Sequence, residues 1–257
     1  MSAGPTHITS RDNPLLKELK RLSQDSTAYR KAGRCWIEGD HLARAALQRG
    51  QRPAIAVLAE SVWPVFGAEF GSVAAKTVIV PDALFDGISG LESPARLGLV
   101  LDLPAEAGLQ PGLPTVILDR VQDAGNVGSI LRSAAAFGFR QVVALKGTAA
   151  LWAPKVLRAG MGAHFALRLV EGGGGDALDA LALPVLVTSS HQGELVHRQT
   201  LPWPCAWVLG HEGQGVSEAL MARATLTVRI AQPGGEESLN VAAAAAICLH
   251  ASAVAHG

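Results

Sequence analysis

The sequence is poor in cysteine, and the few that it has form no pattern. Cys35, Cys205 and Cys248 lie far apart among 257 residues, and no two are spaced as Cys-x-x-Cys. An odd, scattered set argues against a disulfide framework and against a structural zinc site. We therefore expect each cysteine to be a small buried side chain and the protein to need no metal.

Long apolar runs are also missing. A membrane-spanning helix needs about 18 or more apolar residues in succession, whereas the richest run, residues 241–248, is far shorter and mostly alanine. The first residues contain no apolar core of a secretory signal. We expect a cytoplasmic protein without a membrane segment.

Net charge is lacking too, because 22 basic residues balance 22 acidic ones. The whole-chain balance therefore gives no hint of a nucleic-acid partner. Basic residues nevertheless outnumber acidic ones in residues 1–34, which also contain Tyr29. Such a segment could follow a phosphate backbone and stack a base, although a solvated helix face explains it equally well. The candidate RNA contacts are Arg11, Lys17, Lys20, Arg21, Arg30 and Lys31.

What is present is ample material for a core, since 49% of the residues are hydrophobic and only 17% are charged. In residues 1–104 short apolar runs alternate with helical patterns, which indicates an α/β domain. The predicted strands are 35–38, 54–59, 78–80 and 97–101, and the predicted helices are 13–22, 41–49 and 81–88. Residues 105–114 are rich in proline and glycine and are predicted to be a linker.

A second alternation fills residues 115–257. Its strands are nearly continuous apolar runs, which is typical of a parallel sheet covered on both faces. Strands are predicted at 116–118, 141–145, 166–170, 185–188, 206–209 and 226–230, and helices at 126–137, from 154, up to 183, from 216 and at 241–250. We expect a doubly wound sheet.

Three polar segments follow strands of this second sheet. Residues 230–240 end a strand with Pro-Gly-Gly and begin an alanine-rich helix, which Ser238 or Asn240 could cap. Residues 118–138 and 208–217 likewise leave strands, and the second of them contains three glycines around Glu212. Ligands of open α/β sheets bind beyond the carboxyl ends of the strands, so we expect the three segments to share one site.

Together the segments resemble the signature motifs of the SpoU-type ribose 2′-O-methyltransferases of the SPOUT superfamily. The motifs are Asn-x-Gly-x-x-x-Arg from Asn126 to Arg132, Gly-x-Glu-Gly-x-Gly from Gly210, and Glu-Ser-Leu-Asn-Val from 237. The resemblance implies a deep trefoil knot in residues 115–257, S-adenosylmethionine as methyl donor and a homodimer through the catalytic domain. Residues 1–104 look like the family's RNA-binding domain, similar to ribosomal protein L30e, which favours ribosomal over transfer RNA.

The resemblance also implies roles for individual residues. Arg132 would stabilise the developing alkoxide of the ribose. Because a guanidinium stays protonated at neutral pH, Arg132 could accept the hydroxyl proton only in a strongly perturbed site, and a nearby phosphate is the alternative acceptor. Ser238 and Asn240 would position the ribose or Arg132, Asn126 would order the first loop, and Glu212 would anchor the second turn. The cofactor would be bound by Ser189, Leu209, Gly210, Gly213, Ile230, Gln232, Ser238 and Leu239.

Two departures from the family pattern bear on substrate preference. Arg158-Ala-Gly-Met-Gly-Ala163 has glycine where many relatives have serine, and Ile230-Ala-Gln232 stands where relatives often have Ile-Pro-Met. Three alternatives stay open at this stage. They are a transfer-RNA ribose methyltransferase, an RNA-binding protein without activity, and a nucleotide-binding oxidoreductase, although the last would need a Gly-x-Gly-x-x-Gly that is absent.

Overall fold

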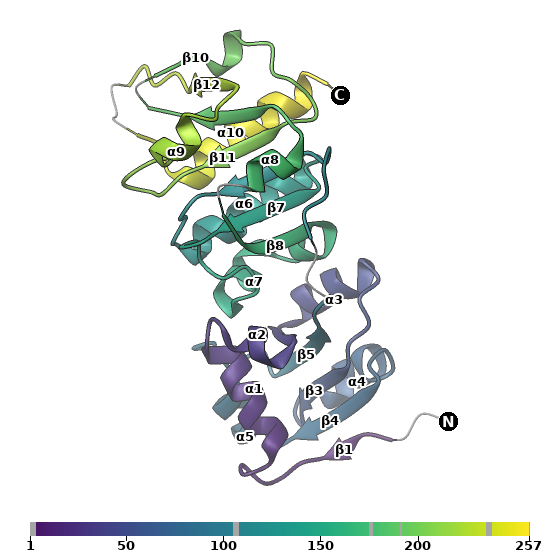
Figure 1. Ribbon diagram of the computed structural model, residues 1–257. Coiled ribbons are helices and arrows are strands. Elements are labelled where there is room, and N and C mark those ends of the chain that lie inside the picture. The colour runs from purple at the N-terminus through teal and green to yellow at the C-terminus, as the bar shows by residue number, and fades with distance from the viewer. Residues whose placement is uncertain (1–3, 105–107, 175–176, 191, 235–237, 257) are drawn as a thin grey trace. The chain divides into compact units, whose positions relative to one another are not determined.

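The computed structural model divides the chain into two compact units (Figure 1). It describes residues 4–104, 108–174, 177–190, 192–234 and 238–256. Unit 1 is Met1–Ala105 with Trp152–Phe165, and unit 2 is Glu106–Leu151 with Ala166–Gly257. The chain therefore enters unit 2, returns to unit 1 for one short segment, and then completes unit 2.

Unit 1 is built on a mixed sheet with strand order β1-β4-β3-β5-β2. β5 runs antiparallel to both of its neighbours, whereas β3 and β4 are parallel. The strands are β1 (Thr6–His7), β2 (Arg34–Glu38), β3 (Ile55–Ala59), β4 (Lys76–Val80) and β5 (Leu97–Asp102). The helices before β5 are α1 (Pro14–Gln24), α2 (Ala28–Ala32), α3 (Asp40–Gln48), α4 (Trp63–Gly71) and α5 (Asp82–Ile88).

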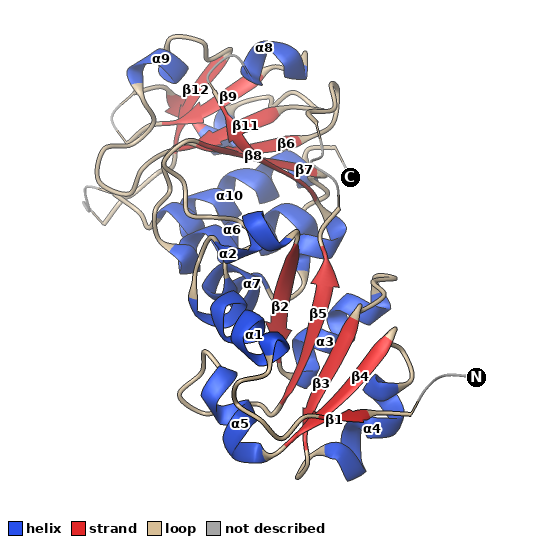
Figure 2. Ribbon diagram, turned by 60° about the horizontal axis from the view of Figure 1, so that its bottom comes forward, coloured by secondary structure: helices blue, strands red, loops and turns tan. Residues whose placement is uncertain are grey.

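Helices cover both faces of this sheet (Figure 2). Leu42 of α3 and Phe70 of α4 pack with Leu99 of β5 in one core cluster. On the other face Phe85 of α5 lies against Trp36, with ring centroids 6.0 Å apart. The predicted strands and helices of this unit are present, but the two-residue β1 and the helices α2 and α4 were not predicted.

The segment that returns to unit 1 contains α7 (Pro154–Gly160) and the 3₁₀ helix η1 (Ala163–Ala166). Leu157 of α7 is buried in the same cluster as Leu42 and Phe70, and Trp152 and Phe165 pack against it. The local sequence pattern does not predict this packing, because an apolar helix face shows that the helix is buried but not which hydrophobic core it contacts.

Unit 2 is built on an all-parallel sheet of order β10-β12-β9-β11-β6-β7-β8. The strands are β6 (Thr115–Leu118), β7 (Gln141–Leu145), β8 (Arg168–Gly173), β9 (Val185–Thr188), β10 (Glu194–Leu195), β11 (Ala206–Leu209) and β12 (Leu226–Arg229). The helices are α6 (Ala124–Ala136), α8 (Ala177–Leu181), α9 (Glu218–Met221), α10 (Val241–Val254) and the 3₁₀ helix η2 (Val196–Arg198). The prediction of two α/β domains, the second with a parallel sheet, is confirmed.

The central strands β6, β7 and β11 of the second sheet are buried on both faces, as their continuous apolar sequences indicate. Ile117 and Val208 point to one side, where they pack with Leu181 of α8 and Leu220 of α9. On the other side the Trp207 indole N–H donates to Ser252 Oγ of α10 at 2.9 Å. A fully buried indole needs such a partner, so this bond fixes α10 on the sheet.

At the amino edge of this sheet the predicted linker is tied down by a buried amide. Gln141 and Thr115 are fully buried. The Gln141 side chain donates to Thr115 Oγ1 at 3.0 Å, and its Oε1 accepts from the Gln110 backbone N–H at 2.9 Å. Residues 105–107 of the linker lie outside the described part of the chain.

The cysteines are buried, as expected. Burial raises the pKa of Cys35 and of Cys248 to about 12, so both thiols stay protonated at neutral pH. Among the described residues, no helix is long and apolar enough to cross a membrane.

Candidate active site

The carboxyl ends of β6 and β11 lie side by side at the centre of the second sheet. The two strands pair in register from Ala206 and Thr115 to Leu209 and Leu118. The ladder continues one step further, because the Asp119 backbone N–H donates to the Leu209 carbonyl at 2.8 Å. The loop after β6 and the turn after β11 therefore leave the sheet as neighbours.

Asn126 joins all three predicted motifs. Its side-chain Nδ2 donates to Glu212 Oε1 of the second motif at 3.2 Å. Its Oδ1 accepts from Asn240 Nδ2 of the third motif at 3.0 Å. Asn126 itself lies in the first turn of α6, where its backbone N–H donates to the capping Asp123 carboxylate at 2.7 Å. One side chain thus links segments more than 80 positions apart in the sequence.

Glu212, in the turn after β11, holds the loop after β6 by accepting hydrogen bonds from its backbone. Its two carboxylate oxygens accept from the backbone N–H groups of Gln122 and Asp123, at 3.3 and 3.2 Å. Partial burial alone would raise the pKa of Glu212, but its hydrogen bonds, those from Asn126, Asp123 and Gln122 among them, lower the pKa below the ordinary value. The carboxylate is therefore ionised at neutral pH and serves as an acceptor.

Asn240 has a second function as the cap of α10. Its Oδ1 accepts from the backbone N–H groups of Ala242 and Ala243, at 2.9 and 3.2 Å. Of the two caps that the sequence allows, the structure uses Asn240, whereas Ser238 is exposed. Glu237, which begins the motif, lies outside the described residues. Because the Asn240 amide also donates to Asn126, the start of α10 and the start of α6 are fixed to each other.

Arg132 lies on α6 and is exposed. Its guanidinium forms no hydrogen bond or ion pair with another described residue. The neighbouring α6 positions Ile130 and Leu131 are buried. The described residues bring Asn126, Glu212 and Asn240 into contact, but they do not join Arg132 or Ser238 to that group.

The turn after β11 is closed by its own backbone. The His211 N–H donates to the Gly215 carbonyl at 3.0 Å, and the Gly215 N–H returns a bond to the His211 carbonyl at 2.8 Å. A Cβ at Gly210 would overlap the backbone of Gly215 and Val216, so only glycine fits there. Gly213 follows in the turn, and its N–H donates to His211 Nδ1 at 3.0 Å.

The remaining predicted cofactor residues flank this turn at the carboxyl ends of neighbouring strands. β9, which ends at Thr188, pairs with both β11 and β12. Ser189 continues β9, with its N–H donating to the Val228 carbonyl at 3.0 Å. Ile230 and Gln232 follow β12 and are half-buried, Leu209 is fully buried, and Leu239 is exposed. The buried Oε1 of Gln232 accepts no hydrogen bond from any residue that the structure describes.

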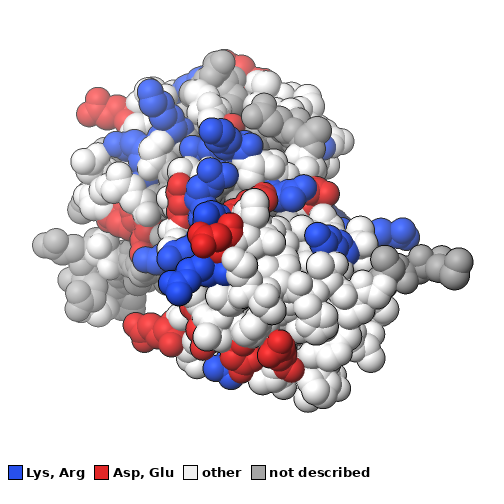
Figure 3. Space-filling view, turned by 90° about the horizontal axis from the view of Figure 1, so that it is seen from below, with Lys and Arg blue, Asp and Glu red and all other residues white. Residues whose placement is uncertain are grey.

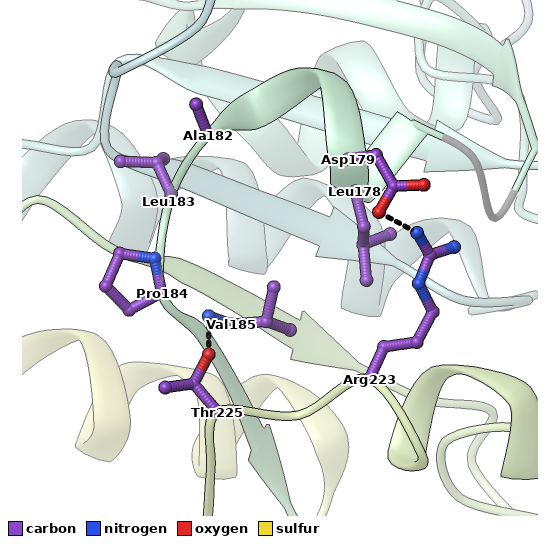
Figure 4. A pocket seen from close by; sticks show the side chains of 8 residues that line it. All are labelled: Leu178, Asp179, Ala182, Leu183, Pro184, Val185, Arg223 and Thr225. Atoms are coloured by element: carbon purple, nitrogen blue, oxygen red, sulfur yellow. Dashed lines mark hydrogen bonds and ion pairs between the residues drawn. The ribbon is translucent and has the colours of Figure 1, made fainter.

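One cavity of unit 2 lies away from the three motifs. It has a volume of about 500 Å³ and lies at the amino end of β9, beside the ion pair of Asp179 and Arg223 (Figure 4). Thr225 Oγ1 closes one wall by accepting from the Val185 N–H at 3.1 Å. Its described lining contains none of the predicted site residues, and it opens at the edge opposite to the three motifs.

The predicted RNA contacts of unit 1 are all exposed. Arg11, Lys17, Lys20 and Arg21 lie before or on α1, and Arg30 and Lys31 lie on α2. Lysine and arginine side chains gather on the face shown in Figure 3, with acidic side chains among them. Lys17, for example, pairs with Asp12 at 3.2 Å.

Tyr29 corrects one expectation. Its ring is only 3% exposed, so it is not available to stack a base. The hydroxyl accepts from Arg30 Nε at 3.2 Å instead. The reason is the unpredicted helix α2, which turns Tyr29 toward the core while its basic neighbours stay in solvent.

Sequence reasoning missed Asp119 and Arg120. Asp119 is buried, and its Oδ2 accepts from the Ser217 N–H at 2.7 Å. Arg120 Nη1 donates to Gln214 Oε1 at 2.8 Å. The sequence feature that could have revealed them is a pair of oppositely charged residues directly after an apolar strand. Among the described residues, no cluster of His, Cys, Asp and Glu could hold a metal ion.

A parallel α/β sheet with glycine turns and polar side chains at its carboxyl edge is typical of enzymes that bind nucleotide-like ligands there. Comparison with known families narrows the class, because residues 114–250 match the SpoU rRNA Methylase family. The chain belongs to this family.

Relatives cover nearly the whole chain. The 23S rRNA (guanosine(2553)-2′-O)-methyltransferase RlmP of Bacillus subtilis is 31% identical over 95% of this chain and 97% of its own. A crystal structure of an RNA 2′-O ribose methyltransferase is 29% identical, with a TM-score of 0.79 over 96% of this chain and 98% of that one. An AdoMet-bound rRNA methyltransferase from Sinorhizobium meliloti is 25% identical, with a TM-score of 0.81 over 96% and 97%.

Family membership confirms the reaction predicted from the motifs. The chain is an RNA ribose 2′-O-methyltransferase that uses S-adenosylmethionine. An oxidoreductase and an RNA-binding protein without activity are thereby excluded.

Proposed function

We propose that the protein methylates a ribose 2′-hydroxyl of ribosomal RNA, with a nucleotide of the large subunit as the first candidate. The observation that carries the proposal is the chain of hydrogen bonds from Glu212 through Asn126 to Asn240, which unites the three motifs of the family. The name of the Bacillus subtilis relative, which is similar over almost its full length, supports the choice of large-subunit RNA.

Residues at the carboxyl edge suit the proposed cofactor. S-adenosylmethionine would supply an electrophilic methyl group, and its adenine carries an exocyclic amine that needs an acceptor. Gln232 offers a buried Oε1 that accepts no hydrogen bond within the described part of the chain. Such an oxygen costs stability unless a ligand supplies a donor. We assign cofactor binding to Gln232 with the backbone around Leu209, Gly210, Gly213, Ile230 and Leu239, and with Ser189 and Ser238 at the rim.

Arg132 is our candidate for the group that assists the attacking oxygen. In the reaction the 2′-oxygen would bond to the methyl carbon, the carbon–sulfur bond would break with its electron pair going to sulfur, and the hydroxyl proton would pass to a neighbouring phosphate of the RNA. A guanidinium that forms no ion pair with another described residue keeps its full positive charge for the alkoxide that develops. Ser238 and Asn240 would orient the ribose, while Asn126 and Glu212 hold the loop.

We further propose a homodimer through unit 2. The outward face of α10 carries apolar side chains that a soluble monomer rarely leaves exposed together, with Ile247 at 41% and Val254 at 65% exposure. His250, on the same face, packs edge-on against Phe137 just after α6, with ring centroids 5.3 Å apart. A partner covering this face would also approach Arg132.

Unit 1 is our candidate for the RNA-binding domain, similar to ribosomal protein L30e, in a cytoplasmic enzyme. Its exposed basic residues on α1 and α2 support this assignment, since phosphate contacts depend on accessible positive charge. The resemblance to the family likewise supports a trefoil knot in residues 115–257, with residues 105–114 as the linker.

The test uses RNA from cells that lack the gene. Purified enzyme and methyl-labelled S-adenosylmethionine are incubated separately with 23S rRNA, 16S rRNA and transfer RNA, and the labelled nucleotide is mapped. We expect 2′-O-methylation at one site of 23S rRNA. Label in transfer RNA alone would contradict the choice of ribosomal RNA, and label on a base would contradict the ribose.

A second experiment tests the RNA-binding unit. Charge reversal at Lys17, Lys20 and Arg21 should weaken RNA binding and reduce its dependence on salt, because fewer counterions are released. An unchanged affinity and salt slope would contradict the assignment of unit 1.

A further inference from the structure

Arg120 adopts a backbone conformation that arginine rarely takes. It follows β6 directly and has φ of +60°. For an L-residue with a Cβ the left-handed region is unfavourable, and glycine or asparagine would occupy it with less strain. An arginine at this position therefore indicates that its side chain has a use that outweighs the local cost.

The guanidinium connects the loop after β6 to the turn after β11. Nη1 donates to Gln214 Oε1 at 2.8 Å, and Nη2 reaches the Gly215 carbonyl at 3.5 Å. Nε pairs with the Asp119 carboxylate at 3.1 Å. The buried Asp119 carboxylate balances the charge of Arg120, so we do not assign Arg120 to an RNA phosphate. Its function is instead to hold the turn through its hydrogen bonds.

Asp119 extends the same connection. Its Oδ2 accepts from the Ser217 N–H at 2.7 Å, so the far end of the turn is held as well. The stem of Arg120 passes close to Gly147, because a Cβ added at Gly147 would come within 3.1 Å of Arg120 Cγ. The glycine therefore leaves room for the arginine stem.

Arg120 and Glu212 form reciprocal connections. Arg120 belongs to the loop and holds the turn at Gln214, while Glu212 belongs to the turn and holds the loop at Gln122 and Asp123. We propose that Arg120 is a positioning residue, which locks the turn of residues 210–217 to the loop of residues 119–126 and so fixes Asn126 and Glu212 for methyl transfer. The inference rests on the proposed place of these two residues in the active site.

The principal variant is Arg120→Asn, since asparagine tolerates a positive φ but cannot reach Gln214. Arg96→Asn is a matched control. Arg96 has φ of +58°, pairs with Asp82 and Asp86, and lies in unit 1. Gln214→Ala and the double variant complete a cycle that isolates the contact between Arg120 and Gln214.

Four quantities are measured for each variant: turnover on RNA, affinity for S-adenosylhomocysteine by calorimetry, hydrogen exchange of the two segments, and the melting temperature. For Arg120→Asn we expect turnover to fall about 10- to 100-fold, as small misplacements of catalytic groups do. Exchange in residues 119–126 and 210–217 should become faster. The melting temperature should stay within about 3 °C of the native value, and the affinity within about threefold, or roughly 0.7 kcal/mol. Arg96→Asn should leave turnover unchanged.

Each other outcome overturns the inference. Unchanged exchange would show that Arg120 does not lock the two segments, and unchanged turnover would show that the lock does not position the site. A loss of turnover that is matched by losses of melting temperature and ligand affinity would make Arg120 a merely structural residue. If the native enzyme methylates no RNA while exchange in the variant is faster, the lock exists but the proposed active site is wrong.

Discussion

The two edges of the parallel sheet in unit 2 both carry polar networks, but the networks differ in access. At the amino edge Gln141 and Thr115 are fully buried and bond to each other and to the linker. At the carboxyl edge Glu212 and Asn240 are exposed to solvent although both are hydrogen-bonded.

The difference in solvent access leads us to expect a structural role for the network at the amino edge and a functional role for the network at the carboxyl edge. A buried amide whose partners are all protein groups has no capacity left for a ligand, and its loss affects folding. Exposed amides and carboxylates that are already oriented can add a substrate to their existing partners. Hydrogen bonding alone therefore does not mark a site, and access has to be considered with it.

The largest effect should come from Arg132→Ala on α6, the helix that begins beside the network at the carboxyl edge. Removing a charge that stabilises the developing alkoxide should lower turnover about 10²- to 10³-fold, or roughly 2.7–4 kcal/mol, without weakening cofactor binding. Turnover on RNA and calorimetry with S-adenosylhomocysteine measure the two quantities. The matched control is Arg140→Ala, an exposed arginine at the amino edge, just before β7. Equal losses of turnover in both variants would contradict the catalytic role of Arg132 and would remove the functional distinction between the two edges.

The next largest effect should be a loss of stability without a loss of turnover. Gln141→Leu leaves the Gln110 N–H without its acceptor and removes the bond that Thr115 Oγ1 accepts, although this hydroxyl still donates to the Leu113 carbonyl, and should lower the free energy of unfolding by about 1–3 kcal/mol. Turnover per folded molecule should not change. Gln110→Leu is the control, because Gln110 bonds through its backbone and its side chain is exposed. Denaturant titration gives the stability, and a loss of specific turnover would place Gln141 in the functional network.

Asn240 combines both functions, and two variants separate them. Asn240→Ala removes the cap of α10 and should cost about 1 kcal/mol of stability together with activity. Asn240→Asp keeps the acceptor for Ala242 and Ala243 but cannot donate to Asn126. It should keep its stability within about 0.5 kcal/mol and lose turnover. If Asn240→Asp retains full turnover, the bond to Asn126 has no catalytic consequence.

Much of this arrangement could be predicted from sequence, and what could not has identifiable causes. Continuous apolar runs predicted the parallel strands because burial on both faces leaves that pattern. The two-residue edge strands β1 and β10 are too short to show any period. The burial of Tyr29 depends on α2, a helix too short for a helical pattern, and the packing of residues 152–165 in unit 1 depends on tertiary contacts.

The site shows the same limit. Motifs placed Asn126, Glu212 and Asn240 on the candidate list, but only the structure reveals that Asn126 bonds to the other two. Asp119 and Arg120 escaped notice because their contacts are with Ser217 and Gln214, nearly a hundred positions away. The roles of Asn126, Glu212 and Asn240 in catalysis and of Arg120 in positioning stay predictions.

The smallest effect concerns the pH dependence of the Glu212 connection. Since hydrogen bonds lower the pKa of Glu212 in the folded protein, its contribution to stability is complete above the unfolded pKa and is lost as pH falls through the folded one. The difference in unfolding free energy between the native protein and Glu212→Gln should therefore be constant from about pH 8 to 5 and shrink only below the ordinary value of 4.5. Denaturant titrations across this range measure it. A difference that already changed between about pH 8 and 6 would contradict the assignment of this dependence to the Glu212 carboxylate.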